Sequence, residues 1–445
     1  MSLELDEFLS LLKDKYPKYH TLKYENITAK AEEIQALLDD KTTLLEYFVA
    51  DSASYLFALS KAKVNLYKIP ITRKKIQKEV RNFRKALTNY QFILNKQDKA
   101  FALFTDKAYW FYENFLKRAL AECQAENLII VADAELGYLP FETFLTKEVK
   151  SQKVDYKNLA YLINDYKISY NYSATLWKEN LNSPKPINNS QVLACAASYG
   201  RPDSNLLNIR KPNIFKNRAH LKPLPAAQTE ITALSKHFQG DFLYGDSTNE
   251  AFFKENAQDY GVIHLAMHGI VHNRVPMLSS LAFTENRDSL EDNFLQAYEI
   301  SKLQLNADLV VLSACETGYG KFEQGEGVVS LARSFMYAGV PSLVVSLWQV
   351  NDNSTARIMK DLYTYLAEGM SKDEALRQAK LNYIKNAKGT IAHPAFWSPF
   401  VQLGDNRPMT IATKGNNYIT WIGGSLGLLV FLLGTARIGR KAELW

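Results

Sequence analysis

The chain has 445 residues, of which 47% are hydrophobic and 22% are charged. This ordinary globular composition excludes wholesale disorder, and the length predicts two or more folded units. The net charge of +6 is mild and comes with no basic tract, so the sequence gives no sign of a nucleic-acid partner. The three cysteines are too few and too scattered for a disulfide framework or a zinc site, and they favour a reducing, cytosolic setting.

The first part of the chain predicts helices, then paired strands, then helices again. Residues 1–40 carry apolar residues at helical spacing, as in "AEEIQALL". The stretch "TLLEYFVADSASYLFALSKAKVNLYKI" is rich in aromatic and β-branched residues around a polar turn at 51–54, which predicts paired strands. Residues 72–125 return to a helical pattern, and residues 128–132 predict a buried strand that leads into a turn and an apolar loop.

The second part of the chain alternates strands with helices. Strands are predicted in "QVLACAAS", "GVIHLAMHG", "DLVVLSACETG" and "PSLVVSLWQV". Helices are predicted in "AAQTEITALSKHF", "GEGVVSLARSFMYAG" and "NSTARIMKDLYTYLAEG", the last capped by Asn353 or Ser354. Continuous apolar strands that alternate with helices predict a mostly parallel sheet with helices on both faces.

The C-terminal segment 415–436 contains no charged side chain, and at about 1.5 Å per residue it spans a bilayer core of roughly 30 Å. Aromatic residues at one end and a basic cluster at the other fit the two membrane interfaces; the alternative is a buried core helix. The basic cluster favours a cytoplasmic C-terminus, but the N-terminus lacks an apolar export signal. We therefore expect a single-pass tail anchor with the globular part in the cytoplasm. Gly423 and Gly427 form a GxxxG motif, which is typical of helix-mediated self-association.

Two reactive residues follow predicted strands in the second part of the chain. His268 ends "VIHLAMHG", and Cys315 ends the apolar run of "VVLSACETG". If the two strands are neighbours in a parallel sheet, both side chains emerge at the same edge. An imidazole beside a thiol suits nucleophilic catalysis, and the backbone N–H groups of Gly269 and Cys315 would then bind the oxyanion of the tetrahedral intermediate. Nothing in this chemistry requires a metal or a cofactor.

Each of these residues also has a purely structural interpretation. A lone cysteine at the end of an apolar strand is usually a small core residue, and a histidine before a glycine is often a turn residue. His264 lies inside its predicted strand and is expected to pack or to hydrogen-bond rather than to react. Cys123 and Cys195 are interpreted as structural. The histidine-to-cysteine spacing of roughly 50 residues agrees with that of caspases.

Several motifs together resemble the CHAT family of caspase-like proteases. They are "VIHLAMHG", "LSACETGYGKFEQGEGVVSLARSFMYAGVPSLVVSLWQVND" and "IIVADAELGYLPFETF", and "LLEYFVADSASYLFALS" resembles the part that precedes the catalytic half in that family. The resemblance implies an α/β caspase-like fold, with a mostly parallel sheet flanked by helices and an inactive N-terminal half. It also implies a His268–Cys315 dyad that cuts peptide bonds. The predicted segments are a helical one at 1–40, the inactive half at 41–157, the catalytic half at 158–406 and the transmembrane helix at 415–436.

Substrate choice rests on a second resemblance. "SLWQVND" is similar to the "LW-x-V-x-D" segment of separases, in which an aspartate faces an arginine side chain. This implies that Asp352 selects arginine or lysine through a charge-assisted bidentate contact, with Glu316 adding acidity and Trp348 as a wall of the pocket. Alternatively, Asp352 caps the following helix, and Trp348 is a core residue.

The hypothesis with most support is thus a membrane-anchored cysteine endopeptidase that cleaves a partner protein. Relatives of this family are encoded in bacterial defence systems, where gasdermin pore-formers are among their targets, and a membrane anchor would suit such a target. The first alternative is a catalytically silent, membrane-tethered scaffold that recruits partner proteins. The second is an acyl or glutaminyl hydrolase that uses the same thiol.

Overall fold

The computed structural model describes residues 2–15, 28–151, 153–182, 190–199, 221–272, 274–285, 291–313, 321–323, 327–329, 331–348 and 352–414. The strands of its main sheet are β1 (Thr42–Val49), β2 (Ser54–Leu59), β3 (Val64–Ile69), β4 (Asn127–Val131), β5 (Lys167–Asn171), β6 (Val192–Ala196), β7 (Gly240–Tyr244), β8 (Val262–Ala266), β12 (Leu309–Leu312), β15 (Ser342–Ser346) and β16 (Phe400–Gly404). Smaller sheets are made of β9 (His268–Ile270), β10 (Ser280–Ala282) and β11 (Phe294–Gln296), and of β13 (Lys321–Glu323) and β14 (Gly327–Val329).

The helices are α1 (Ser2–Lys15), α3 (Ala31–Gln35), α4 (Arg73–Thr88), α5 (Tyr90–Asn95), α6 (Gln97–Phe115), α7 (Lys117–Glu122), α8 (Leu162–Asp165), α9 (Ala174–Asn182), α10 (Pro225–Ser235), α11 (Glu250–Asn256), α12 (Ala297–Ile300), α13 (Leu331–Tyr337), α14 (Asp352–Ala367), α15 (Lys372–Asn386) and α16 (Pro394–Trp397). Two 3-10 turns, η1 (Ala134–Tyr138) and η2 (Phe141–Thr143), follow β4.

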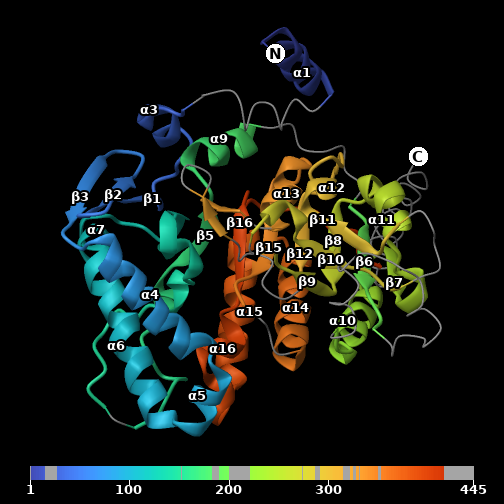
Figure 1. Cartoon of the computed structure of the whole chain (residues 1–445). Helices are drawn as coiled ribbons and strands as arrows, with labels where there is room; N and C mark the ends of the chain where they lie inside the picture. The colour runs from blue at the N-terminus through green and yellow to red at the C-terminus, as the bar shows by residue number, and fades with distance from the viewer. Residues whose placement is uncertain are drawn as a thin grey trace, which may run out of the picture.

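The main sheet has 11 strands in the order β3-β2-β1-β4-β5-β16-β15-β12-β8-β6-β7 (Figure 1). The strands from β15 to β7 are all parallel, and β1, β4, β5 and β16 are parallel to one another. β16 runs antiparallel to β15, and β2 and β3 form an antiparallel edge. Figure 1 shows α10, α14 and α15 in a row on one side of the sheet and α9, α13 and α11 on the other. The predicted mostly parallel sheet with helices on both faces is therefore confirmed.

The N-terminal part of the molecule packs around aromatic side chains. The apolar residues of α4 recur at helical spacing and are buried, and the helix packs against α6 and η1. The ring of Phe83 lies 5.5–5.9 Å from the rings of Phe104, Phe111 and Phe144, so one α4 side chain contacts both α6 and the residue that follows η2. The paired strands predicted around the turn at 51–54 are β1 to β3, and the helices predicted at 72–125 are α4 to α7.

The first strand after the predicted boundary at 157/158, β5, lies in the middle of one continuous sheet. β5 follows that boundary in the chain but pairs with β4 on one side and with β16 on the other. A buried ion pair between Glu142 of η2 and Lys380 of α15 also joins the two predicted halves. Side chains from both halves thus share one core at this position.

Two local predictions are wrong. The predicted helix "GEGVVSLARSFMYAG" begins only at Leu331, and its first part contains strand β14, because glycines and β-branched valines are poor helix formers. Asn353 and Ser354 do not cap the next helix, because α14 already begins at Asp352. The hydroxyl of Ser354 instead lies 2.9 Å from the hydroxyl of Tyr383 on α15.

Among the described residues, no helix has the length and the apolar character needed to cross a membrane. The predicted transmembrane segment 415–436, with Gly423 and Gly427, lies outside the described residues. Its membrane role therefore stays a prediction.

Candidate active site at the carboxyl edge of the sheet

The strands that lead to His268 and Cys315 are parallel neighbours. β8 pairs with β12 in a register that sets Leu265 opposite Leu312. His268 follows Leu265 by three positions (265 to 268), and Cys315 follows Leu312 by three positions (312 to 315). The condition set by the sequence, that the two strands be neighbours, is therefore met. Cys315 itself lies outside the described residues, which end at Ser313 on this side.

The imidazole of His268 is half-buried and is held by a backbone carbonyl. Its Nε2 atom lies 2.8 Å from the carbonyl oxygen of Lys222, just before α10. Because a carbonyl can only accept a hydrogen bond, Nε2 carries a proton. In the neutral ring Nδ1 is then the basic nitrogen, so this contact fixes the tautomer as well as the ring orientation.

Tyr199 contacts His268 both through its ring and through a hydrogen bond to the backbone. The two ring centroids are 4.7 Å apart. The Tyr199 hydroxyl accepts a hydrogen bond of 2.8 Å from the backbone N–H of His268 and donates one of 2.6 Å to the carbonyl of Ala282. Ala282 faces His268 across the β9–β10 ladder, so the hydroxyl bridges this pair. Because successive N–H groups of a strand point to opposite sides, the N–H of Gly269 points away from β10.

Replacing Tyr199 with phenylalanine should lower both stability and activity. The loss of activity should be larger than the loss that reduced stability alone would cause. The variant keeps the ring beside His268 but leaves the His268 N–H and the Ala282 carbonyl without the hydroxyl that they share. We expect a loss of about 1–3 kcal/mol in the free energy of unfolding. We also expect a fall of about tenfold in kcat/KM, because the imidazole loses part of its support. Urea unfolding and peptide cleavage measure the two effects separately; an unchanged kcat/KM would show that this contact is dispensable.

The predicted pocket residues are only partly described. Trp348 follows β15 and is 2% exposed, and its indole N–H donates to the carbonyl of Ala395 at 3.3 Å. This burial fits the core alternative for Trp348. Asp352 is the first residue of α14, and nothing is described of its side chain. Glu316 lies outside the described residues, so the roles of Asp352, Glu316 and Trp348 in substrate choice stay predictions.

The other two cysteines are poor nucleophiles. Cys195 lies inside β6 and is fully buried, and burial raises the pKa of its thiol to about 12. Burial also raises the pKa of the half-buried Cys123. Since the thiolate is the reactive form, neither described thiol is activated. This agrees with their interpretation as structural residues.

Two supporting groups, Tyr199 and the carbonyl of Lys222, were not predicted. Tyr199 follows the predicted strand "QVLACAAS", so it also stands beyond the carboxyl end of a parallel strand, and that position was the available signal. Lys222 is followed by a proline in "LKPLP", which favours an extended backbone at Lys222. Only the folded structure brings its carbonyl to His268, 46 positions further along the chain.

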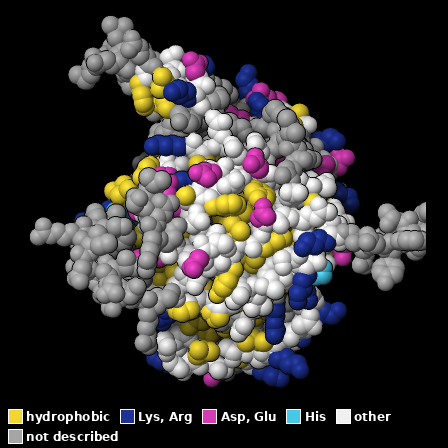
Figure 2. Space-filling model, turned by 90° about the vertical axis from the view of Figure 1, so that its right-hand side faces the viewer, with side chains coloured by type: hydrophobic (Ala, Val, Ile, Leu, Met, Phe, Trp, Pro, Cys, Tyr) yellow, Lys and Arg dark blue, Asp and Glu magenta, His cyan; other side chains and the backbone are white. Residues whose placement is uncertain are grey.

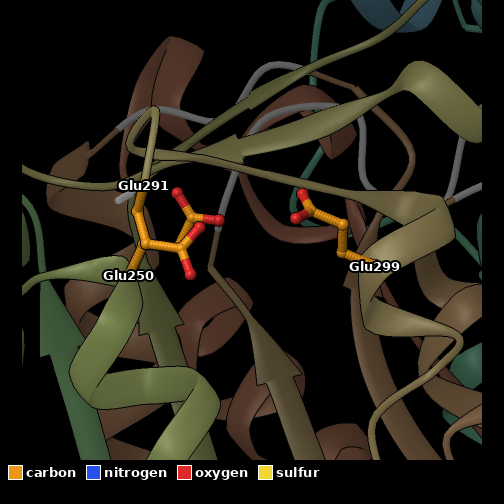
Figure 3. Close-up of side chains that lie close together, drawn as sticks. All are labelled: Glu250, Glu291 and Glu299. Atoms are coloured by element: carbon orange, nitrogen blue, oxygen red, sulfur yellow. The ribbon is translucent and has the colours of Figure 1, made fainter. Parts of the chain in front are cut away.

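A group of three glutamates is the one set of described residues with metal-ligand spacing (Figure 3). Glu250 of α11, Glu291 and Glu299 of α12 have carboxylate oxygens within 4.8 Å of one another. Each of them, however, also lies 2.7–2.8 Å from the ammonium nitrogen of Lys254. A side-chain cation therefore already neutralises part of this charge, and the three carboxylates raise the pKa of Lys254 although burial acts in the opposite direction.

This cluster predicts a pH dependence of stability. Burial, with the charges of its neighbours, raises the pKa of Glu250 to about 7. Between the ordinary pKa and pH 7 the folded state holds a proton that the unfolded chain has released, so stability falls as the pH rises through this window. We expect the free energy of unfolding to fall by about 2 kcal/mol from pH 5 to pH 7.5 through Glu250. Urea unfolding of Glu250→Gln should lack this decrease; an identical slope in the variant would contradict the assignment.

Figure 2 views the molecule from the side of β7 and α11. Hydrophobic side chains form a broken band across this face, and lysine and arginine side chains collect toward one rim. Acidic side chains are scattered among them, so charges of both signs are present on this face.

The model of the CHAT domain matches residues 106–405, about two thirds of the chain. The chain belongs to the CHAT domain family. The matched part of this CHAT protein contains His268 and Cys315 but not β1 to β3, where the stretch "LLEYFVADSASYLFALS" lies.

Curated relatives and solved structures extend this finding. Human tetratricopeptide repeat protein 28 is 30% identical over 316 residues, which are 63% of the CHAT protein and 12% of that relative. The crystal structure of the Saccharomyces cerevisiae separase–securin complex is similar with a TM-score of 0.52 at 11% identity, over 90% of the CHAT protein and 33% of that chain. The cysteine proteinase gingipain R matches with a TM-score of 0.43 at 10% identity, over 70% of the CHAT protein and 69% of that chain. The CHAT protein thus spans only a small part of its curated relative, and the separase comparison establishes a caspase-like α/β fold.

Proposed function

We propose that this CHAT protein is a cysteine endopeptidase in which Cys315 is the nucleophile and His268 the general base. The observation that carries the proposal is the hydrogen bond of 2.8 Å from His268 Nε2 to the Lys222 carbonyl. This bond leaves Nδ1 as the basic nitrogen, on a strand end next to the one that leads to Cys315.

The chain length between the described residues and the nucleophile supports the same pairing. Cys315 follows Ser313 by two positions, which limits its Cα atom to about 7 Å from that of Ser313. Ser313 directly follows β12, the neighbour of the strand that precedes His268. A thiol within this distance of Ser313 would lie near the end of β8, the strand that leads to the His268 imidazole.

The proposed reaction is acyl transfer in two halves. Nδ1 of His268 takes the proton of the Cys315 thiol, and Sγ attacks the carbonyl carbon of the scissile peptide. The N–H groups of Gly269 and Cys315 bind the oxyanion, and the proton passes from His268 to the leaving amine. Water then attacks the thioester with His268 as the base, which releases the new carboxylate and restores the thiol.

The proposed substrate is a protein cut after a basic residue. A carboxylate at Asp352 would bind arginine or lysine in a charge-assisted contact, as in the separase segment that "SLWQVND" resembles. Segment 415–436 would anchor the protease to a membrane with the catalytic part in the cytoplasm. A gasdermin-type pore-former in a bacterial defence system would be a target that acts at that membrane.

A catalytically silent scaffold is the second candidate, favoured by the relative that is named as a tetratricopeptide repeat protein. The thiol itself distinguishes the two functions. A peptidyl electrophile with a basic residue at its recognition position should label Cys315 of an endopeptidase far faster than Cys123 or Cys195. A scaffold would show no such preference.

The decisive experiment maps new protein N-termini in cells that produce the parent protein or Cys315→Ala. An endopeptidase should generate cleavage sites that are absent with the variant, and most should follow arginine or lysine. If Asp352→Ala cuts after basic residues as well as the parent does, the pocket assignment is wrong, while the dyad assignment stands. Hydrolysis of simple amides without any new N-termini would instead favour the acyl hydrolase.

A further inference from the structure

A buried carboxylate lies behind the candidate active site and belongs to no part of the dyad. Glu230 is on the inner face of α10 and is 4% exposed. Its Oε1 atom lies 3.0 Å from Nε2 of His264, and its Oε2 atom accepts a hydrogen bond of 3.2 Å from the hydroxyl of Ser313. On the other side of the imidazole, Nδ1 of His264 lies 3.1 Å from the hydroxyl of Tyr363 on α14.

These contacts comprise two hydrogen bonds, Ser313–Glu230 and His264–Tyr363, and one contact at ion-pair distance. Oε1 of Glu230 and Nε2 of His264 are 3.0 Å apart, but neither atom has a hydrogen-bond partner among the described residues. Burial and the charge of Glu230 raise the pKa of the Tyr363 hydroxyl well above its usual value. His264 is completely buried and lies in hydrogen-bond contact with Tyr363, as expected for a residue inside an apolar strand.

The partners of Glu230 lie on the chain segments that carry the proposed catalytic groups. Ser313 precedes Cys315 by two positions, and His264 precedes His268 by four. Glu230 is on α10, which begins three positions after Lys222, whose carbonyl holds the His268 ring. The Glu230 side chain therefore contacts both the segment that leads to Cys315 and the strand that leads to His268. Its own helix, α10, follows Lys222, whose carbonyl orients the His268 ring.

We infer that Glu230 is a positioning residue that aligns Cys315 with His268 by holding Ser313 and α10 together. The inference rests on the proposed function and adds a residue to it. Because Ser313 and Glu230 are both buried, an unpaired Ser313 hydroxyl is costly, so the arrangement that keeps their hydrogen bond is the stable one. Loss of the Glu230–Ser313 hydrogen bond frees the end of β12, and a displacement of about 1 Å at a nucleophile is enough to cost roughly 100-fold in rate.

Ser313→Ala tests the inference, with Ser342→Ala as the matched control. Ser342 is also a buried serine of the same sheet, and its hydroxyl accepts a hydrogen bond of 3.2 Å from Gln402. It lies at the first position of β15, at the opposite end of its strand from the candidate site. Each variant removes one buried hydrogen bond, so the two should lose similar stability. The measurement is the rate of Cys315 alkylation by iodoacetamide as a function of pH, followed by peptide mass spectrometry, with Cys123 as the internal reference.

We expect Ser313→Ala to slow alkylation of Cys315 about tenfold at pH 7 and to raise the midpoint of its pH profile by about one unit. Ser342→Ala should match the parent in both the alkylation rate and the midpoint of the pH profile. Glu230→Gln, whose amide can still form a hydrogen bond with Ser313, should stay within about threefold of the parent, and Glu230→Leu should resemble Ser313→Ala. Equal rates and midpoints in Ser313→Ala and Ser342→Ala would overturn the positioning role alone. If parent Cys315 reacts no faster than Cys123, and His268→Ala changes nothing, the dyad itself fails and the positioning role fails with it.

Discussion

Replacing Cys315 with alanine will abolish peptide cleavage, and replacing His268 with alanine will lower kcat/KM by at least about 10³-fold. The sulfur supplies the nucleophile, and its removal leaves no thiol at this position. The imidazole supplies the base, and its ring is already held with Nε2 bonded to the Lys222 carbonyl. Both variants should unfold within about 1 kcal/mol of the parent, since neither is expected to leave a buried group unpaired. Cleavage of a basic-residue peptide and urea unfolding measure the two quantities.

The double variant gives a sharper test of the pairing. Residues that act as one unit are strongly non-additive, so His268→Ala in the Cys315→Ala background should cause no further loss. Cys123→Ala and Cys195→Ala are the matched controls, because burial raises the pKa of both thiols and keeps them protonated. Each control should keep full activity. If Cys315→Ala keeps residual cleavage, and this disappears only when Cys123→Ala is added, then Cys123 is the nucleophile.

The edge of the sheet at which the site forms could be predicted from the sequence. Apolar strands alternating with helices determine a parallel sheet, and His268 and Cys315 each follow one of these strands. That β8 and β12 are neighbours, with Leu265 opposite Leu312, depends on strand order. Strand order is a long-range property, and local periodicity does not contain it.

The supporting groups could not be predicted for the same reason. The carbonyl of Lys222 reaches His268 across 46 positions, and Glu230 reaches Ser313 across 83. A backbone carbonyl has no residue-type signature, and a glutamate in an amphipathic helix is usually a solvated residue. In contrast, the packing role of His264 could be predicted, because a position inside an apolar strand already implies burial.

The largest effect on stability is expected at the ion pair of Glu142 and Lys380. Their side chains are 2–4% exposed, and Tyr170 donates a second hydrogen bond to the same carboxylate. Replacing Lys380 with methionine leaves a buried carboxylate without its counter-charge, and Glu142→Gln leaves a buried ammonium. Either change should cost about 3–5 kcal/mol of the free energy of unfolding, because a single buried charge keeps its full desolvation cost. Urea unfolding of each single variant measures this loss.

The double variant Glu142→Leu with Lys380→Met should lose much less than the sum of the single variants, since both charges leave the core together. The control is the pair of Glu113 and Lys117, which has a similar composition and a separation of 2.8 Å but is exposed. Glu113→Gln should cost no more than about 0.5 kcal/mol.

A pH dependence distinguishes a charged from a neutral Lys380 in the variant that lacks Glu142. Burial lowers the pKa of Lys380, and Glu142 opposes this effect, so Glu142→Gln should lower that pKa further. A lysine whose folded-state pKa lies below its unfolded value binds fewer protons in the folded state, so stability rises with pH until the unfolded pKa is reached. The free energy of unfolding of Glu142→Gln should therefore rise from pH 7 to pH 10 more steeply than that of the parent. The pH slopes of Glu142→Gln and the parent could instead be equal, and the losses of the two single variants could add up in the double variant. That result would mean that the two charges do not depend on each other and that apolar packing alone joins η2 to α15.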